Sequence, residues 1–444
     1  MAFTTQKHLT SLFEFLKIPS ISAQSNHAAD IQKAASWLKV KLVELGFSSS
    51  ILPTKGHPVV YGELLANFNL PTVLVYGHYD VQSPDPLNEW SSGPFEPTVR
   101  AGNIYCRGVA DDKGQLYTWI AAIEELQLAN SMPKVNIKFL IEGEEEVGSK
   151  NLSEFVKDNR ALLKADVCVI SDSHCLSPNQ PLIEYGLRGL TYTEVHLKTF
   201  PKDVHSGLYG GNVPNPIQIL SSMISKLKDD SGKVLVPGFY DNIRRLTKTE
   251  RKQLNKLPFG KDQVLEETGS LVIFGEPQFT IAERAGARPT LEINGIWGGY
   301  QGEGPKTIIP GEAWAKISMR IVPFQNSQEI FEKFKAFIKS LTPKGVLSEV
   351  KFISSAEPIL LDTKAKYFKY SESAYKSIFG KTPIYGLSGG TIGVVADFKN
   401  VLGIDSILMG YGLPDDGLHS PNEKLSLAMF EKGIKTNIEF FKMF

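Results

Sequence analysis

Two hydrophobic periods alternate along the chain. Apolar residues at helical spacing predict amphipathic helices over residues 5–17, 28–45, 364–379 and 427–442. Short, nearly continuous apolar runs predict buried strands at 72–76, 135–141, 166–170 and 405–409. Because such runs alternate with helices, including one expected over 115–128, the pattern indicates an α/β unit with a parallel sheet.

The pattern changes after Gly189. Residues 191–197 alternate between apolar and polar side chains, as in a strand with one exposed face. A helix at 215–228, strands at 289–294 and 313–322, a helix at 327–341 and a strand at 349–354 follow, with a long polar insertion over 229–268. Strand, helix, two strands, helix and strand is the ferredoxin-like order. We therefore predict three segments: 1–189 and 359–444 form one domain, and 190–358 form a domain inserted into it.

Composition narrows the class of protein. The 444 residues carry 48 basic and 48 acidic side chains, so net charge gives no reason to expect binding to nucleic acid or to an anionic membrane. No apolar run approaches the ~20 residues of a membrane span. The N-terminal residues lack the pattern of a signal peptide. The three cysteines, Cys106, Cys168 and Cys175, show no CxxC spacing, so we expect free thiols and a cytoplasmic location.

Acidic residues follow the predicted strand at 135–141. Four glutamates lie within five positions, at Glu142, Glu144, Glu145 and Glu146. Like charges gathered at the end of a strand repel one another unless water or a cation compensates them. Taken alone, this run would be interpreted as a solvated acidic loop.

Other short stretches also place metal-ligating side chains beside apolar runs. They contribute His78 and Asp80 after 72–76, Asp111 and Asp112 before the helix at 115–128, and Asp172 after 166–170. In open α/β sheets, ligands bind at the carboxyl ends of the strands. His, Asp and Glu without Cys are ligands of catalytic zinc, of manganese, or of a pair of such ions. Structural alternatives stay open, because Asp111 could cap the helix and His78 could lie in an ordinary loop.

Six motifs occur in order along the chain. They are GHYDV (77–81), RGVADDKG (107–114), EGEEEVGS (142–149), SDS (171–173), HSGLYGGNVPNP (205–216) and DDGLHSPNEK (415–424). Together they resemble the M20 family of metallopeptidases, and the loop at 205–216 most resembles its carnosinase-like and cysteinylglycine-type dipeptidases. The resemblance implies a zinc-exopeptidase-like catalytic domain with a mixed, largely parallel sheet, and an inserted ferredoxin-like lid and dimerisation domain.

The resemblance also implies a site with two divalent ions, usually Zn²⁺ and sometimes Mn²⁺. Asp111 would bridge the ions, with His78 and Asp172 on one and Glu146 and His419 on the other. A cis peptide is implied between Asp111 and Asp112. Glu145 would be the general base.

By the same resemblance, Asp80 would orient His78. The site would therefore combine five metal ligands with two carboxylates that act beside them. The combination of residue types suits hydrolysis of a peptide bond, because bound metal ions activate water and a carboxylate can move its proton.

Substrate contacts are implied for four residues: Thr307, Arg320, Thr391 and His205. Arg320 would pair with the free carboxylate of a small peptide, although a surface ion pair is the ordinary alternative for an arginine on a strand. In dimeric members of the family, the histidine equivalent to His205 reaches the site of the other subunit. We therefore expect a homodimer formed through 190–358.

One departure from the family bears on substrate choice. The carnosinases carry a further substrate-contacting histidine near the end of the inserted domain, and residues 351–358 (KFISSAEP) contain none. We therefore expect a dipeptidase that does not favour carnosine. The alternatives are a deacylase of N-acyl amino acids, which shares every metal residue, and a non-catalytic metal-stabilised binding protein.

Overall fold

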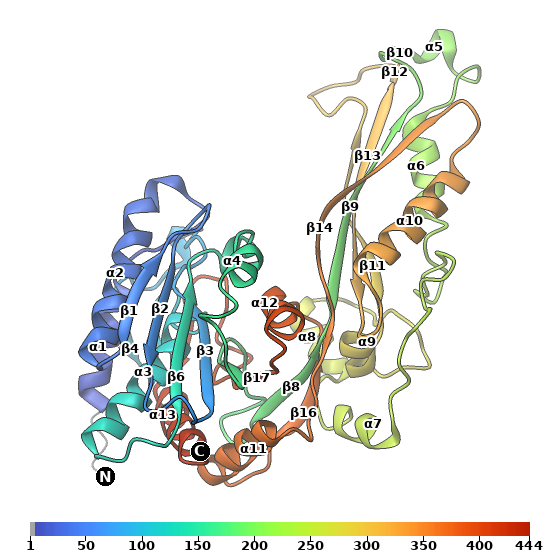
Figure 1. The fold of residues 1–444 in the computed structure, drawn as a ribbon. Coiled ribbons are helices and arrows are strands. Elements are labelled where there is room, and N and C mark those ends of the chain that lie inside the picture. The colour runs from blue at the N-terminus through green and yellow to red at the C-terminus, as the bar shows by residue number, and fades with distance from the viewer. Residues whose placement is uncertain (1–4) are drawn as a thin grey trace. The chain divides into compact units, whose positions relative to one another are not determined.

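The chain divides into two compact units. The computed structural model describes residues 5–444 (Figure 1). The first unit contains the described residues up to 185, together with 361–386 and 393–444, and the second contains 186–360 and 387–392. The segment expected as an insertion, 190–358, lies within the second unit. Residues 387–392, which include Thr391, also cluster with the second unit although the chain on both sides belongs to the first.

A mixed sheet forms the centre of the first unit. Its strands lie in the order β1-β2-β6-β3-β7-β17-β8. The pairs β6/β3, β3/β7 and β7/β17 are parallel, whereas β1/β2, β2/β6 and β17/β8 are antiparallel. The strands span Ser48–Leu52 (β1), Val59–Leu64 (β2), Thr72–His78 (β3), Asn136–Glu142 (β6), Val167–Ile170 (β7), Leu182–Leu187 (β8) and Ser406–Leu408 (β17). The predicted α/β class is confirmed, with the parallel strands at the centre of the sheet.

Helices pack against this sheet (Figure 1). Helix α2 contacts β1 and β2, α3 contacts β3, and α13 lies between α3 and α11. The helices span Thr5–Leu16 (α1), Ala28–Glu44 (α2), Lys113–Leu128 (α3), Leu152–Asp158 (α4), Lys366–Phe379 (α11), Gly393–Asp397 (α12) and Leu427–Phe441 (α13). Helix α3 is buried on all sides: the ring of Trp119 lies edge-on to Phe440 and Phe441 of α13. No helix among residues 5–444 is long and apolar enough to cross a membrane.

The second unit is a four-stranded antiparallel sheet with helices on one face. The strand order is β11-β13-β9-β14, from Thr290–Gly298 (β11), Glu312–Ile321 (β13), Gly189–Lys198 (β9) and Leu347–Ala356 (β14). Helices α6 (Pro216–Ile224) and α10 (Ser327–Leu341) cover the face formed by alternate buried residues of β9 and β13 (Figure 1). This is the predicted ferredoxin-like order, and the alternation of residues 191–197 explains why one face of β9 is buried under the helices.

Shorter elements complete both units. The predicted polar insertion at 229–268 contains α7 (Lys248–Leu254) and α8 (Lys261–Thr268), and α9 (Ile281–Ala287) precedes β11. Near the beginning of β13, β10 (Val204–His205) pairs with β12 (Ile308–Ile309), and α5 (Ser206–Tyr209) follows β10. In the first unit, β18 (Lys424–Ser426), β5 (Asn103–Tyr105) and β4 (Thr98–Arg100) form a small sheet. Strand β16 (Ile384–Ser388) pairs with β8, and β15 (Ile359–Leu360) pairs with residues 186–187 of β8.

Candidate metal centre

The predicted ligand residues follow four adjacent strands of the first unit. His78 ends β3, and Glu146 follows β6 on a short 3₁₀ turn (Glu145–Val147). Asp172 follows β7, and His419 lies on the long loop after β17. Because β6, β3, β7 and β17 are parallel neighbours, their carboxyl ends meet at one edge of the sheet. Asp111 reaches the same place from the segment before α3.

Asp111 lies between the two histidines. Its Oδ1 is 3.0 Å from Nε2 of His78, and its Oδ2 is 2.9 Å from Nε2 of His419. Nε2 of His78 is also 3.8 Å from Oδ2 of Asp172, and Nε2 of His419 is 3.3 Å from Oε2 of Glu146. Each oxygen of Asp111 therefore faces a different group of ligand atoms.

Two groups of residues could each hold a metal ion. His78, Asp111 and Asp172 form one, and Asp111, Glu146 and His419 form the other; within each, the ligand atoms lie within 4.8 Å of one another. Imidazole nitrogens and carboxylate oxygens are the donors that zinc and manganese accept. The shared aspartate gives the arrangement of a bridging carboxylate between two cation sites.

Burial and crowding of acids change how these groups titrate. Burial and the nearby charges of Asp172 and Glu146 raise the pKa of Glu145 to about 8. Burial and the Asp111 carboxylate raise the pKa of Asp172 to about 7. Hydrogen bonds with Asp111 and Glu146 raise the pKa of His419 to about 10. The surplus of buried acids is the charge distribution that a bound cation would compensate.

Asp80 supports the glutamate turn as well as His78. Its carboxylate oxygens accept hydrogen bonds from the backbone N–H groups of Glu145 (3.3 Å) and Glu146 (3.1 Å). Nδ1 of His78 lies 3.1 Å from the Asp80 backbone oxygen and 3.5 Å from its Oδ1. One buried carboxylate therefore links the imidazole of one ligand to the backbone of another.

The peptide between Asp111 and Asp112 is cis, as the resemblance predicted. Asp112 is fully buried, and its Oδ2 accepts a hydrogen bond from the backbone N–H of His78 (3.3 Å). Its Oδ1 has no hydrogen-bond partner among residues 5–444. Asp112 thus fixes the end of β3 through the backbone of His78.

Three residues that sequence reasoning did not select also hold the centre together. Gln82 donates from Nε2 to Oε2 of Glu146 (2.9 Å), Gln115 joins Ala110 to the chain after β17, and the buried Glu423 accepts hydrogen bonds from residues 107–111. Gln82 and Gln115 each lie one residue beyond a motif, GHYDV and RGVADDKG respectively, and Glu423 lies within DDGLHSPNEK. Their position beside ligands was the available signal, but their contacts depend on the fold.

The predicted substrate residues lie in the second unit, at two places. Arg320 donates from Nη1 to Oγ1 of Thr391 (2.7 Å), and Thr391 donates to the backbone oxygen of Arg188 (2.6 Å). Burial and the charge of Arg320 lower the pKa of Arg188 to about 10. Neither Arg188 nor Arg320 forms an ion pair within residues 5–444, so these two half-buried cations lie together without a directly bonded carboxylate. Arg188 was missed because a single arginine beside two glycines has no distinctive pattern.

His205 and Thr307 form the other place. His205 pairs with Ile308 across β10 and β12, and Ser206 donates its backbone N–H to the Thr307 oxygen (3.0 Å). Nδ1 of His205 accepts a hydrogen bond from the backbone N–H of Gly207 (3.0 Å). In a neutral imidazole the proton is then on Nε2, which makes Nε2 a hydrogen-bond donor. Thr307 comes before β13, which begins at Glu312. Arg320 lies near the other end of this strand, roughly 26 Å from Glu312 at the usual rise per residue of a strand.

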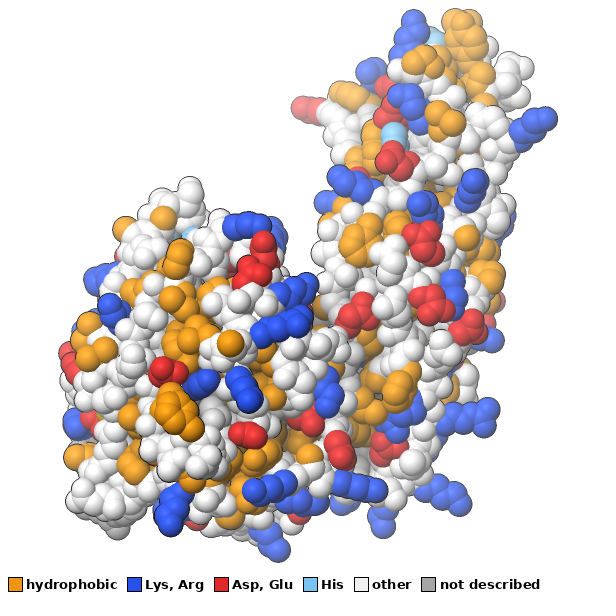
Figure 2. All heavy atoms as spheres, viewed as in Figure 1, with side chains coloured by type: hydrophobic (Ala, Val, Ile, Leu, Met, Phe, Trp, Pro, Cys, Tyr) orange, Lys and Arg blue, Asp and Glu red, His pale blue; other side chains and the backbone are white. Residues whose placement is uncertain are grey.

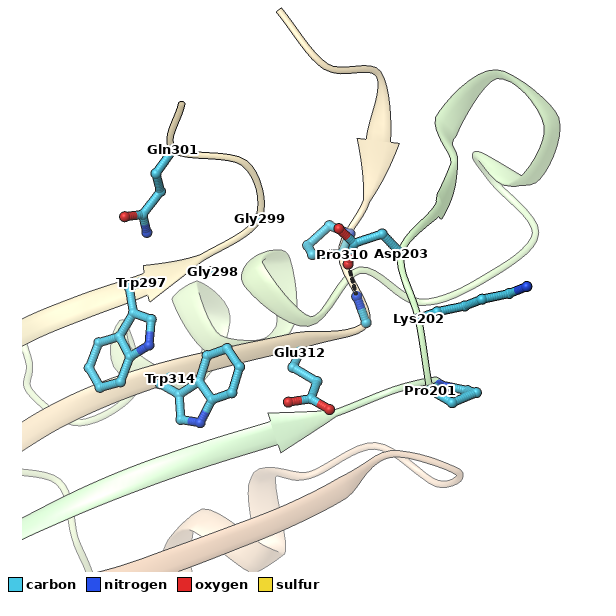
Figure 3. A pocket seen from close by; sticks show the side chains of 11 residues that line it. Pro201, Lys202, Asp203, Trp297, Gly298, Gly299, Gln301, Pro310, Glu312 and Trp314 are labelled. Carbon is cyan, nitrogen blue, oxygen red and sulfur yellow. Dashed lines mark hydrogen bonds between the residues drawn. The ribbon is translucent and has the colours of Figure 1, made fainter. Parts of the chain in front are cut away.

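A cavity in the second unit contains none of the predicted site residues. It has a volume of about 490 Å³, and Trp297, Trp314, Lys202, Asp203 and Glu312 are among the residues that line it (Figure 3). The Trp297 and Trp314 rings are parallel across β11 and β13, with centroids 5.9 Å apart. The carboxylates already have partners: Glu312 contacts Lys198 and His196, and Asp203 accepts from the backbone N–H of Gly311. The candidate chemistry therefore lies in the first unit.

The fold and the centre define a metallopeptidase class, and sequence comparison gives the family. Residues 74–442 match the model of Peptidase family M20/M25/M40, so the chain belongs to this family of hydrolases. The predicted family is confirmed.

Three relatives show how far the similarity extends. The Cys-Gly metallodipeptidase dug1 of Schizosaccharomyces pombe is 32% identical over 96% of this chain and 93% of its own length. The Beta-Ala-His dipeptidase of Homo sapiens is 32% identical over 86% of this chain and 77% of its own. The crystal structure of the M20 family metallo-carboxypeptidase Sso-CP2 from Sulfolobus solfataricus superposes with a TM-score of 0.88, at 36% identity over 98% of both chains.

Proposed function

We propose that this protein is a dinuclear-metal dipeptidase. The observation that carries the proposal is the pair of ligand groups joined by Asp111, with Glu145 next to Glu146 on the same turn. Relatives named as metallodipeptidases match nearly the whole chain, which supports the same chemistry here. In this proposal, His78, Asp111 and Asp172 hold one ion, and Asp111, Glu146 and His419 hold the other.

The ions supply what the side chains cannot. When bound, two divalent ions would polarise the scissile carbonyl and lower the pKa of water towards neutrality. Zn²⁺ suits this set of imidazole and carboxylate donors, and Mn²⁺ is the second candidate. The crowding of buried acids supports the proposal, because ions at both groups would compensate that charge.

Glu145 is the proposed general base. Its carboxylate has no hydrogen-bond partner within residues 5–444, and its raised pKa of about 8 suits proton transfer near neutral pH. It would accept a proton from the attacking water and then donate it to the nitrogen of the leaving amine. Asp80 would hold the Glu145 backbone through the N–H contact of 3.3 Å, which fixes the position from which the Glu145 side chain extends.

Arg320 is the proposed partner of the substrate carboxylate. It has no acidic partner within the described chain, and Thr391 holds its guanidinium from one side. Arg188 adds positive charge next to it. Arginine pairs with carboxylates through two parallel hydrogen bonds, which would select peptides with a free C-terminus. Thr391 would contribute by positioning and by contact with the same substrate.

We also propose that the protein is a homodimer formed through the second unit. Outer strands β11 and β14 expose apolar side chains, including Ile296 (51% exposed), Leu347 (70%) and Ile353 (43%), and Leu208 on α5 is 70% exposed. Groups of exposed apolar residues on two strands and a helix are typical of interaction surfaces. His205 and Thr307, near the beginning of β13, would then serve the metal centre of the partner, with the Nε2 proton of His205 donated to the developing oxyanion.

Several further features belong to the proposal. Figure 2 shows acidic and basic side chains interspersed over the visible face of each unit, which favours a small peptide as the substrate rather than a polyanion.

Cys106, Cys168 and Cys175 are buried and free, which supports a reducing, cytoplasmic location. Residues 351–358 offer no histidine to a substrate, so a Cys-Gly type of dipeptide is preferred over carnosine.

A second candidate is a carboxypeptidase that acts on longer peptides. The similarity to Sso-CP2, which is named a metallo-carboxypeptidase and matches at 36% identity, favours it. A carboxypeptidase would use the same metal ligands and the same arginine, and it would differ in tolerating residues N-terminal to the scissile bond. The deacylase alternative gains no support from these relatives, whose names refer to peptide substrates.

The deciding experiment is hydrolysis of a substrate panel by metal-stripped protein resupplied with Zn²⁺ or Mn²⁺. The panel contains Cys-Gly, Ala-Gly, Leu-Leu, carnosine, N-blocked tripeptides and N-acetyl amino acids. We expect metal-dependent cleavage of the first three dipeptides, with carnosine poor and acetyl amino acids untouched. Cleavage of the N-blocked tripeptides in preference to dipeptides would establish the carboxypeptidase instead. Absence of any hydrolysis with either metal would overturn the proposal.

A further inference from the structure

Glu423 joins two segments that approach the metal centre from different parts of the chain. Its carboxylate is completely buried and accepts hydrogen bonds from three backbone N–H groups: those of Gly108 (2.9 Å), Ala110 (2.8 Å) and Asp111 (3.1 Å). Arg107 donates from Nη1 at 2.8 Å. A carboxylate with four donors is fully satisfied, and it fixes the backbone that carries Asp111.

The same residue lies at the base of the loop that carries His419. The backbone N–H of Lys424 donates to the Asp416 oxygen (2.9 Å), which closes this loop, and Lys424 pairs with Tyr105 in the small sheet. His419 lies near the middle of the loop in a left-handed conformation, with φ of 61°. The position of His419 relative to Asp111 therefore depends on how the loop base is attached to residues 107–111.

The two ligand groups of the centre differ in how firmly regular secondary structure holds their residues. His78 ends a central strand and Asp172 comes two residues after one. Glu146 lies on a 3₁₀ turn, and the His419 side chain is 55% exposed on its loop. Loss of the Glu423 contacts would free both Asp111 and His419 but would leave His78 and Asp172 held by the sheet.

We propose that Glu423 is a positioning residue that sets the affinity of the ion held by Asp111, Glu146 and His419, more than that of the ion held by His78, Asp111 and Asp172. The inference rests on the dinuclear centre of the proposed function. Gln115 acts in the same direction, because its Nε2 donates to the Ala110 oxygen (2.7 Å) and its Oε1 accepts from the Tyr411 N–H (2.7 Å). Mutation of residues that hold metal ligands in place commonly lowers metal affinity by roughly tenfold to a hundredfold.

The test is titration of metal-stripped protein with Co²⁺, followed by calorimetry and by visible absorption. For the unaltered chain we expect two Co²⁺ ions per chain. For Glu423→Gln we expect one ion to bind roughly tenfold to a hundredfold more weakly and the affinity of the other to change much less, with a corresponding loss of part of the absorption. Glu276→Gln is the matched control, because Glu276 is a buried partner of Arg288 in the second unit, with contacts of 2.8 and 2.9 Å.

The control shows what the loss of a buried ion pair does when the pair has only a structural role. Glu276→Gln should lower thermal stability and leave both Co²⁺ affinities unchanged. Equal weakening of both ions in Glu423→Gln, parental affinity for both, or selective loss of one ion in Glu276→Gln would each overturn the inference. If Glu423→Gln does not fold, Arg107→Met/Glu423→Gln removes the buried unpaired cation, and the same selective loss is expected from it.

The two proposals fail in distinguishable ways. If the unaltered chain binds two Co²⁺ ions but cleaves no dipeptide, the proposed activity is wrong and the role of Glu423 is still decided by its own titration. If the unaltered chain binds fewer than two ions, the dinuclear centre is wrong and the role of Glu423 is overturned with it.

Discussion

Neighbouring residues of the same type have different surroundings in this centre. Glu146 directs its Oε2 to His419 at 3.3 Å and to the amide of Gln82 at 2.9 Å. Glu145, the next residue along the chain, has a raised pKa and no partner for its carboxylate within residues 5–444. Glu144 accepts from the Asn151 amide at 2.8 Å and belongs to neither ligand group. Three adjacent glutamates are therefore suited to different tasks.

Replacing Glu145 with Gln tests the base. The variant keeps the size of the side chain but cannot accept a proton, so we expect kcat to fall by roughly a hundredfold to ten-thousandfold with metal content and thermal stability unchanged. Steady-state kinetics on Ala-Gly and metal analysis of the same sample make the measurement. Glu144→Gln is the matched control and should retain parental kcat. Parental turnover by Glu145→Gln would assign the base to another residue.

Replacing Arg320 with Met tests the carboxylate contact. A lost charge-assisted hydrogen bond should raise KM for dipeptides by roughly tenfold to a hundredfold. The same substitution should leave cleavage of the corresponding C-terminal amide, already poor, nearly unchanged. The ratio of kcat/KM for the acid and the amide, measured in both proteins, checks this expectation. An equal loss on both substrates would mean that Arg320 acts only through the fold.

At the scale of elements, the strands and helices that carry the centre were largely predictable. Strong periods placed β3, β6, β7 and α3 within a few residues, because a strand or helix buried on all sides allows little except apolar residues. Strand β8 and helix α9 were missed. Tyr185 and Glu184 of β8 interrupt its apolar run, and the seven residues of α9 are too few to establish a period.

Candidate site residues could be predicted from the sequence where they lie within motifs. Contacts between distant segments of the chain could not be predicted. Residues 77–81 and 415–424 were singled out from sequence, but the sequence does not say that Glu423 accepts hydrogen bonds from residues more than 300 positions earlier. Arg188 was likewise not selected from the sequence, because it becomes a candidate only through its closeness in space to Arg320 and not through its neighbours in the chain. Long-range polar contacts depend on the completed fold, which local patterns do not encode.

A buried charge cluster between helices gives a prediction for pH. Glu124 of α3 faces Lys7 at 2.6 Å, Lys41 at 3.6 Å and His8 at 3.4 Å, and Glu125 also contacts His8. The contact with His8, aided by the two lysines, lowers the pKa of Glu124 to about 2. A carboxyl group whose pKa is lower in the folded state stabilises the fold above its unfolded pKa and loses that contribution as pH falls.

Glu124→Gln should therefore lower the melting temperature at pH 6 by roughly 1 °C for each kcal/mol lost, because the unfolding entropy of ~2.1 cal/mol/K per residue is summed over 444 residues. The difference from the parent should begin to shrink below the ordinary Glu pKa of 4.5 and should vanish as the pH approaches 2. Thermal unfolding of both proteins between pH 6 and pH 3 makes the comparison. Glu439→Gln, which alters an exposed pair with Lys442, should cause little change. A difference that grows towards pH 3 would contradict the assignment.

At the scale of the whole molecule, the two units divide the proposed work. The first carries the ligands and the base, and the second carries Arg320, Thr391, His205 and Thr307. Within the second unit, these residues lie towards opposite ends of β13. Two separate places on one unit are what a dimer would need if each served a different metal centre.

Mixing two inactive variants tests the dimer. We expect His205→Ala and Glu145→Gln homodimers each to be nearly inactive, and mixed dimers to regain activity. In a mixed dimer, the chain with an intact base would receive His205 from its partner, which gives one working site in two and at most about a quarter of parental activity after random exchange. Activity is measured after chain exchange, and analytical ultracentrifugation checks assembly. Exchange without recovered activity would remove the role of His205 across the interface.

The interrupted first unit also has a consequence for the order in which the protein is made. Strand β7 ends at Ile170, yet its parallel neighbour β17 begins at Ser406 and His419 comes still later. A ribosome therefore releases nearly the whole second unit before the sheet of the first can be completed, and closing so long a loop slows pairing of its strands. We expect the nascent chain to fold its second unit first and to gain the complete set of proposed metal ligands only after His419 has emerged. Hydrolase activity would then be absent from nascent chains in which β17 and His419 are still to be made.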